Sequence, residues 1–261
     1  MINFVNEPKC LFSMKTLLSL LICLSFALFS FAQTDSTAKV SKWQFNGELG
    51  LDMSFQSGNL QSSSIVGQFS PSLENSNVTI TSFVQYMYSR YDQTVYQNDI
   101  PSELSADIWY KRRFFPNVSG RFEATTLRAI KDRIGIGPGI AWRAFKTQKS
   151  DLVVLNSVYY YRTTFNLARE LSFEKFLYVL TLKGTYATLG DKLNISHDLQ
   201  YIPWVRQEKT NHILRAILSF GLPITDQFAV NIDVDYIYES LVVRNRKNSN
   251  LTTAFGIAYA F

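Results

Sequence analysis

The feature that most constrains this chain is a long run in which apolar and polar side chains alternate. Between Trp43 and Gln56, odd positions carry large apolar residues or Gly, and even positions carry polar residues or Gly. Successive side chains of a β-strand point to opposite faces, so the run predicts a strand with one apolar and one polar face. It is much longer than the ~5–6 residues of an ordinary globular strand.

The same alternation recurs to the end of the chain, for example in 102–110 and in 228–236. Each stretch is bounded by residues typical of turns, and the pattern predicts about twelve strands. Their predicted bounds are 42–55, 62–73, 78–91, 102–114, 118–127, 134–145, 152–163, 174–187, 193–202, 211–222, 228–239 and 250–261.

The predicted connections differ in length according to the strand that they follow. Short turns follow even-numbered strands, whereas longer polar loops are expected after several odd-numbered ones. This contrast is typical of outer-membrane barrels, and an even strand number closes the sheet without an edge in lipid. We therefore expect an all-β, closed antiparallel transmembrane barrel over 42–261, in a Gram-negative outer membrane with both termini periplasmic. The short turns are expected at 74–77, 115–117, 146–150, 188–192 and 223–227, and the long loops at 92–101, 164–173 and 240–249.

The first residues indicate export. Met14 and Lys15 precede an apolar run over 17–31, which ends beside Ala32 and is shorter than the ~20 residues of a spanning helix. We expect a leader with a signal peptide over 1–32 that is removed, with Met14 as an alternative start, and a short periplasmic segment over 33–41. Both cysteines, at positions 10 and 23, fall in the leader, so the mature chain has neither a disulfide nor a zinc–thiolate site.

Charge and the chain end narrow the partners. The 26 basic and 21 acidic residues are spread along the chain, which argues against a nucleic-acid binder. Gly256, Tyr259 and Phe261 resemble the C-terminal signal that the outer-membrane assembly machinery reads. The expected partners are this machinery and outer-membrane lipid and glycolipid, with the chain itself a monomer.

Several motifs together resemble a bacterial family. They are Ser57-Gly58-Asn59, the Gly-alternating strand over 134–140, Tyr161-Arg162, and the strand over 197–203 that ends in Tyr-Ile-Pro. With these motifs the chain resembles the salt-induced outer-membrane proteins of the domain of unknown function 481. Leu60 and the Ala-Trp pair at 141–142 depart from the family pattern. The resemblance implies an outer-membrane location and supplies no catalytic residues. Gly and Asn tolerate φ > 0, so Ser57, Gly58 and Asn59 also predict a hairpin turn.

The sequence does not predict an enzyme. Ser196, His197 and Asp198 are adjacent, so in a strand the histidine faces away from its two neighbours. Gly135, Gly137 and Gly139 are not followed by a helix that could bind phosphate, and we expect them on a lumen-facing strip where neighbours need room. No cofactor or metal is expected. Asn231, Asp233 and Asp235 lack further ligands for calcium, so pairing with lumen arginines is the favoured interpretation.

The polar faces carry charges of both signs, which we expect to line the lumen. They could form a narrow passive channel, which is the favoured interpretation, or pair across the interior of a closed structural barrel. An outer-membrane lipid hydrolase is a third, weaker alternative. The expected lumen residues are Glu48, Asp52, Asp107, Lys111, Arg113, Arg121, Glu123, Arg143, Lys183, Asp198, Asp233 and Asp235.

The last long loop carries a basic surface. Arg244, Arg246 and Lys247 are expected to contact phosphate groups of the outer-leaflet glycolipid, and the alternative is a solvated loop.

Overall fold

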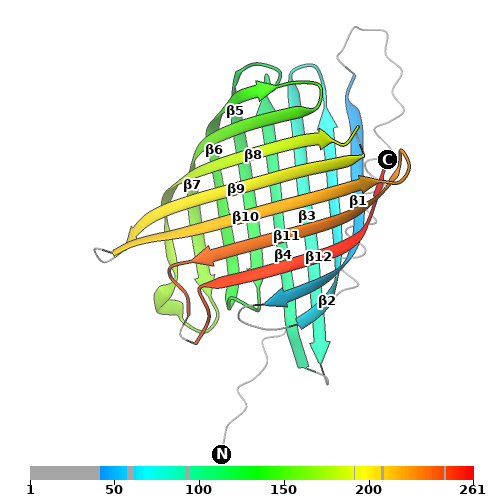
Figure 1. Cartoon of the computed structure of the whole chain (residues 1–261). Coiled ribbons are helices and arrows are strands. Elements are labelled where there is room, and N and C mark those ends of the chain that lie inside the picture. Colours follow the sequence, from blue (N-terminus) through cyan, green and yellow to red (C-terminus); the bar gives the residue numbers. More distant parts are fainter. Residues whose placement is uncertain (1–41, 58–61, 92–93, 191, 207–208, 244) are drawn as a thin grey trace, which may run out of the picture. The chain divides into compact units, whose positions relative to one another are not determined.

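The computed structural model describes residues 42–57, 62–91, 94–190, 192–206, 209–243 and 245–261. They form one closed antiparallel barrel of twelve strands, in which each strand pairs with its neighbours in sequence (Figure 1). The all-β, twelve-stranded prediction is confirmed. The predicted leader, the segment 33–41, and Gly58 and Asn59 of the predicted turn lie outside the described residues.

The strands are 12 to 17 residues long, more than the ~9–11 residues that a tilted strand needs to span a bilayer. Between β7 and β8 lies a short 3-10 helix, Arg169–Leu171. The strand bounds are β1 Gln44–Ser57, β2 Ser62–Glu74, β3 Val78–Tyr91, β4 Thr94–Ile108, β5 Phe114–Thr125, β6 Ile130–Lys146, β7 Ser150–Phe165, β8 Phe173–Thr188, β9 Leu193–Arg206, β10 Lys209–Pro223, β11 Phe228–Glu239 and β12 Ser249–Ala260.

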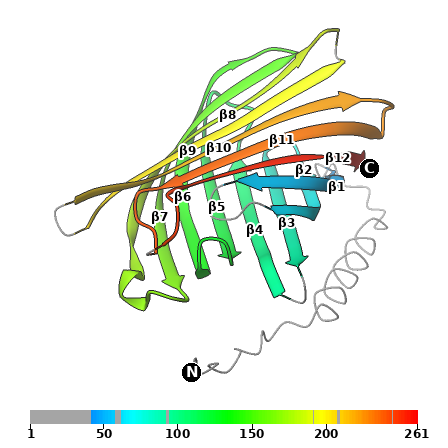
Figure 2. The ribbon, with the colours of Figure 1, turned by 60° about the horizontal axis from the view of Figure 1, so that its bottom comes forward.

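The barrel closes where β1 meets β12, which lie side by side in Figures 1 and 2. Their register pairs Asp52 with Gly256. The chain end extends this seam, because the Gly47 amide donates to the Phe261 carbonyl oxygen (3.1 Å) and the Phe261 amide donates to the Gly47 carbonyl oxygen (3.0 Å). The last residues therefore complete the hydrogen bonding of the first strand and leave no open sheet edge there.

The outer surface is apolar on every strand. Exposed aliphatic and aromatic side chains alternate with residues that point inward, as in Leu49, Leu51, Met53 and Phe55 of β1. A closed sheet with an apolar exterior satisfies its backbone internally and suits lipid, so the chain is a β-barrel of the outer-membrane type. Among the described residues no helix is long and apolar enough to span a membrane.

The fourth strand differs from its prediction. We expected 102–114, but β4 starts at Thr94 and ends at Ile108. Trp109 adopts a positive φ of 55°, which turns the chain into 109–113 although the alternation continues through it. The predicted loop 92–101 and turn 115–117 are consequently wrong, because both fall largely within strands. The longest connections between strands are 166–172 and 240–248, and both follow odd-numbered strands.

Apolar side chains also fill one side of the interior. Tyr159, Tyr161, Leu177, Ile202 and Trp204 belong to a buried cluster on the inner faces of β7 to β10. A second cluster joins the turn 126–129 to the loops 166–172 and 240–248, through Ala129, Ala168 and Val243 among others. These clusters leave the polar space of the lumen to the remaining wall. They also correct one expectation: Tyr159 and Tyr161 point inward and do not belong to an interfacial girdle.

Candidate channel lumen

A cavity of about 300 Å³ lies inside the barrel. Its wall comes from strands on both sides of the molecule, with polar side chains such as Gln68, Ser70 and Gln85 beside the charged ones. Water and small polar solutes suit such a lining. The charged residues of its wall are Glu103, Glu123, Asp198, Asp233, Asp235, Arg121, Lys183 and Arg215.

A first ion-pair network crosses this cavity. Arg121 on β5 pairs with Glu103 on β4 at 2.8 Å, and Lys183 on β8 pairs with Asp198 on β9 at 3.4 Å. These partners stand opposite each other in the strand registers. Lys183 also donates to Glu103 (3.1 Å), although β4 and β8 are not neighbours in the barrel. This bond bridges the lumen and narrows the space beside it.

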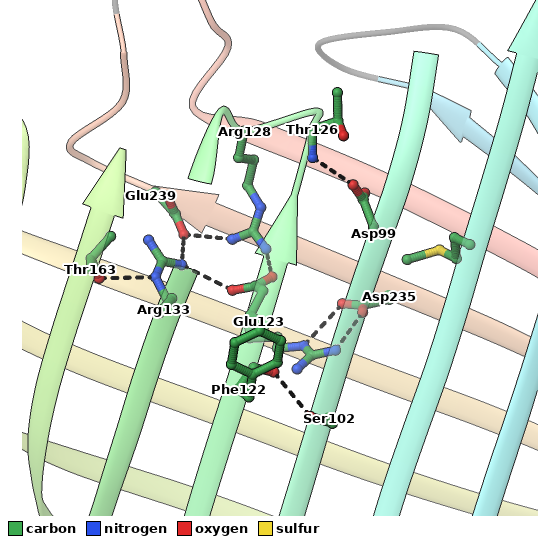
Figure 3. A network of polar contacts seen from close by, with 12 residues as sticks. Asp99, Ser102, Phe122, Glu123, Thr126, Arg128, Arg133, Thr163, Asp235 and Glu239 are labelled. Atoms are coloured by element: carbon green, nitrogen blue, oxygen red, sulfur yellow. Dashed lines mark hydrogen bonds and ion pairs between the residues drawn. The ribbon is translucent and has the colours of Figure 1, made fainter. Parts of the chain in front are cut away.

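A second network lies at the end where β5 joins β6, and Figure 3 shows its members converging from several strands. Arg133 of β6 pairs with Glu123 of β5 (3.2 Å) and with Glu239 at the end of β11. Arg128, in the turn 126–129, also pairs with Glu123, and it donates to Glu239 (2.6 Å). Arg133 donates in addition to Thr163 Oγ1 (3.2 Å). The four charges balance, two against two.

The turn that carries Arg128 folds inward. Leu127 and Ala129 are buried on either side of it, and a space of about 50 Å³ remains beside Arg128, Glu123 and neighbouring strands. Burial lowers the pKa of the Arg128 guanidinium, while the Glu239 carboxylate opposes this shift. An arginine nevertheless stays charged at neutral pH. This end of the lumen is therefore a constriction held by buried ion pairs.

Smaller polar contacts secure other parts of the wall. Arg215 of β10 pairs with Asp235 of β11 at 2.8 Å. Near the turn 109–113, Arg143 pairs with Asp151 at 3.0 Å. Asn117 donates to Asp107 at 2.6 Å. Each pair joins neighbouring strands, so these contacts fix register and leave the centre of the lumen open.

The structure places most predicted lumen residues on the inner face. Lys111 and Arg113 are exceptions, and the prediction is wrong for them: β4 ends before them, and both side chains are exposed in the turn 109–113. The residues that turn inward are Glu48, Asp52, Asp107, Arg121, Glu123, Arg143, Lys183, Asp198, Asp233 and Asp235.

Several inner charges were missed from the sequence. Glu103 shares the parity of Asp107, and Glu239 shares that of Asp235, so alternation alone could have found both. Arg128 was missed because it lies in a turn where parity says nothing, and Asp99 because a loop was predicted there. The missed residues are Asp99, Glu103, Arg128, Arg133, Arg215 and Glu239.

The alternating glycines of β6 lie where the sequence analysis expected, under bulky neighbours. A Cβ at Gly135 would overlap the Tyr161 ring, and one at Gly137 would overlap the Val158 carbonyl oxygen. Gly139 has equally little room beside Ser157. The strip therefore lets β7 and its inward tyrosines pack closely.

The residues considered for hydrolysis do not converge. His197 faces outward and stacks on Tyr186, with ring centroids 5.6 Å apart, whereas Asp198 faces the lumen and pairs with Lys183. Within the part of the chain that the structure describes, no group of three or more His, Cys, Asp or Glu side chains could hold a metal ion.

The remaining predicted residues lie at the two ends of the strands. Gly256 points inward beside Asp52, whereas Tyr259 and Phe261 pack against each other on the outer surface, with centroids 6.3 Å apart. Ser57 ends β1. Arg246 and the exposed Lys247 lie in the loop 240–248, and Arg244 lies outside the described residues.

Comparison with known proteins supports the fold. The NanC porin is 13% identical, with a TM-score of 0.53 over 81% of this chain and 98% of that one. The KdgM porin is 14% identical, with a TM-score of 0.47 over 82% and 99%. An outer membrane channel from Pseudomonas putida F1 is 10% identical, with a TM-score of 0.47 over 88% and 100%. No curated protein gives a significant match. The family model described as a protein of unknown function, DUF481, matches residues 33–261, so the chain belongs to this family, as its motifs indicated.

Proposed function

We propose that the chain is a narrow outer-membrane channel through which small polar solutes or ions diffuse passively. The observation that carries the proposal is the polar cavity of about 300 Å³ inside a closed barrel whose exterior is apolar. An apolar exterior suits lipid, and a charged interior suits water and solutes. The bond from Lys183 to Glu103 across the lumen accounts for a narrow path.

The expected surroundings of the channel follow from the same barrel. We assign the short turns and both termini to the periplasm, because the longest connections, 166–172 and 240–248, lie at the opposite end. Arg246 and Lys247 in the second of these loops would then face the glycolipid phosphates. The outward Tyr259 and Phe261 would be accessible to the assembly machinery, and a closed sheet needs no second copy. Production under salt stress stays a prediction.

Single-channel conductance of the refolded protein in a planar bilayer tests the proposal. The wild type is expected to give discrete steps. Lys183→Ala removes the bond that bridges the lumen while Glu103 keeps Arg121, so we expect a larger step size. Leu182→Ala, one residue away on the outer face of the same strand, is the matched control and should leave the step unchanged.

A closed structural barrel is the second candidate. The buried network of Glu123, Arg128, Arg133 and Glu239 supports it, because these side chains fill one end of the lumen. Silence from a protein whose folding is shown by heat-modifiable gel mobility would favour this candidate and refute the channel. A lipid hydrolase has no support from the site, since His197 faces away from its neighbours.

A further inference from the structure

Three acidic side chains stand together on the wall where the barrel closes. Glu48 and Asp52 project inward from β1, and Asp233 projects inward from β11. Only β12 separates the two strands, and neighbouring strands lie ~4.8 Å apart. Asp233 is close enough for its charge to repel both Glu48 and Asp52. We call these three residues the acidic wall.

The strand between them offers no bulk and no positive charge. In the register, Asp52 faces Gly256 and Asp233 faces Ala254. The Asp52 carboxylate leans over Gly256, where a Cβ would overlap it. The carboxylates on β1 and β11 therefore border a shallow strip of small residues along β12.

Asp52 has no partner for its charge. Its side chain is only 2% exposed, and neither carboxylate oxygen has a hydrogen-bond partner among the described residues. Asp233 accepts a hydrogen bond from Ser219. Within the described part of the chain, no Lys or Arg lies in ion-pair range of any of the three. A buried carboxylate without a partner is costly, so this wall favours a mobile cation close to it.

The basic side chains of the lumen are engaged elsewhere. Lys175, on a distant part of the wall, lies over the Trp204 ring at 4.7 Å. The others are held by carboxylates, so their charge is largely neutralised locally. Those ion-paired residues are Arg121, Arg128, Arg133, Arg143, Lys183 and Arg215.

From this arrangement we propose that the lumen selects small inorganic cations over anions, and that the acidic wall is the element that selects them. The inference rests on the proposed channel function and names the class of solute that the channel takes. Fixed charges of one sign in a narrow lumen raise the local concentration of the opposite ion. The basic isoelectric point of the whole chain, about 9.1, would by itself suggest the opposite selectivity.

The reversal potential across a planar bilayer under a potassium chloride gradient tests this inference. The wild type is expected to pass potassium in preference to chloride. Asp52→Asn with Asp233→Asn keeps the side-chain shapes and should lower the potassium-to-chloride permeability ratio about twofold or more. Asp226→Asn makes the same chemical change in the exposed turn 224–227 and is the matched control, with the ratio expected to stay within error of the wild type.

The outcomes separate the two proposals. Conductance without a preference for potassium, or a ratio that the double variant leaves unchanged, overturns the acidic wall and leaves the channel standing. Silence from folded wild-type protein refutes the channel and this inference together. If the double variant fails to fold, Asp233→Asn alone provides the test, because Asp233 is half-buried and lines the cavity.

Discussion

Replacement of Glu239 by Gln probes the network that closes one end of the lumen. The Glu239 side chain is 3% exposed and is shared between Arg128 and Arg133. The amide keeps the shape of the carboxylate but removes its charge, so the two arginines are left with Glu123 alone. The buried network then carries one uncompensated positive charge.

The magnitude follows from this loss of balance. Removal of one partner from a buried ion pair costs about 3–5 kcal/mol, because the other charge stays desolvated. Lys146 offers a contrasting pair, since its side chain is 54% exposed and lies 3.8 Å from Asp151. An exposed pair contributes about 0–1 kcal/mol. We therefore expect Glu239→Gln to lower the free energy of unfolding by about 3–5 kcal/mol and Lys146→Ala by less than about 1 kcal/mol.

Urea unfolding in lipid vesicles, followed by tryptophan fluorescence, measures both values. The double change of Glu239→Gln with Arg128→Leu restores charge balance, because Arg133 keeps Glu123 at 3.2 Å. Coupling between contacting residues is about 0.5–3 kcal/mol, so the double variant should be more stable than the sum of the single losses. A loss below about 1 kcal/mol for Glu239→Gln, or strict additivity of the two changes, would refute the reasoning.

Two further predictions concern the faces of the wall. Ile232→Lys places a charge on the outer face of β11 and should cost about 2–4 kcal/mol in the same urea assay, whereas Asp233→Lys points inward toward carboxylates and should not; equal losses would contradict the assignment of faces. Gly137→Ala forces a methyl group against the Val158 carbonyl oxygen and should cost about 1–3 kcal/mol. Gly67→Ala is its control, with open space around the added carbon, and an equal loss there would mean that packing is not the cause.

Alternation along the chain was sufficient to predict the barrel. In 43–56 each residue type already states which face it occupies, because lipid accepts Leu51 and Met53 whereas the lumen accepts Asp52. The same argument failed at Trp109, where a positive φ ends β4 although the apolar and polar residues continue to alternate. Alternation describes faces, and it carries no information on where a backbone turns.

The charge partners could not be read in the same way. Glu239 and Arg133 are 106 residues apart, and they meet only because the curvature of the barrel brings β6 and β11 to one end of the lumen. Lys183 likewise reaches Glu103 across strands that never pair. The sequence predicted that the interior would hold both signs of charge, but it could not separate ion-paired side chains from free ones.

What the sequence determined by itself is the fold class, the two faces of the strands and the inward position of most acidic and basic residues. These properties depend on a local period of two, which neighbouring residues suffice to express. What only the tertiary structure decided is which charges neutralise one another, where the lumen narrows, and that Glu48, Asp52 and Asp233 are left without a basic partner among the described residues. Those outcomes depend on distances across the closed barrel, and closure joins residues that no local pattern relates.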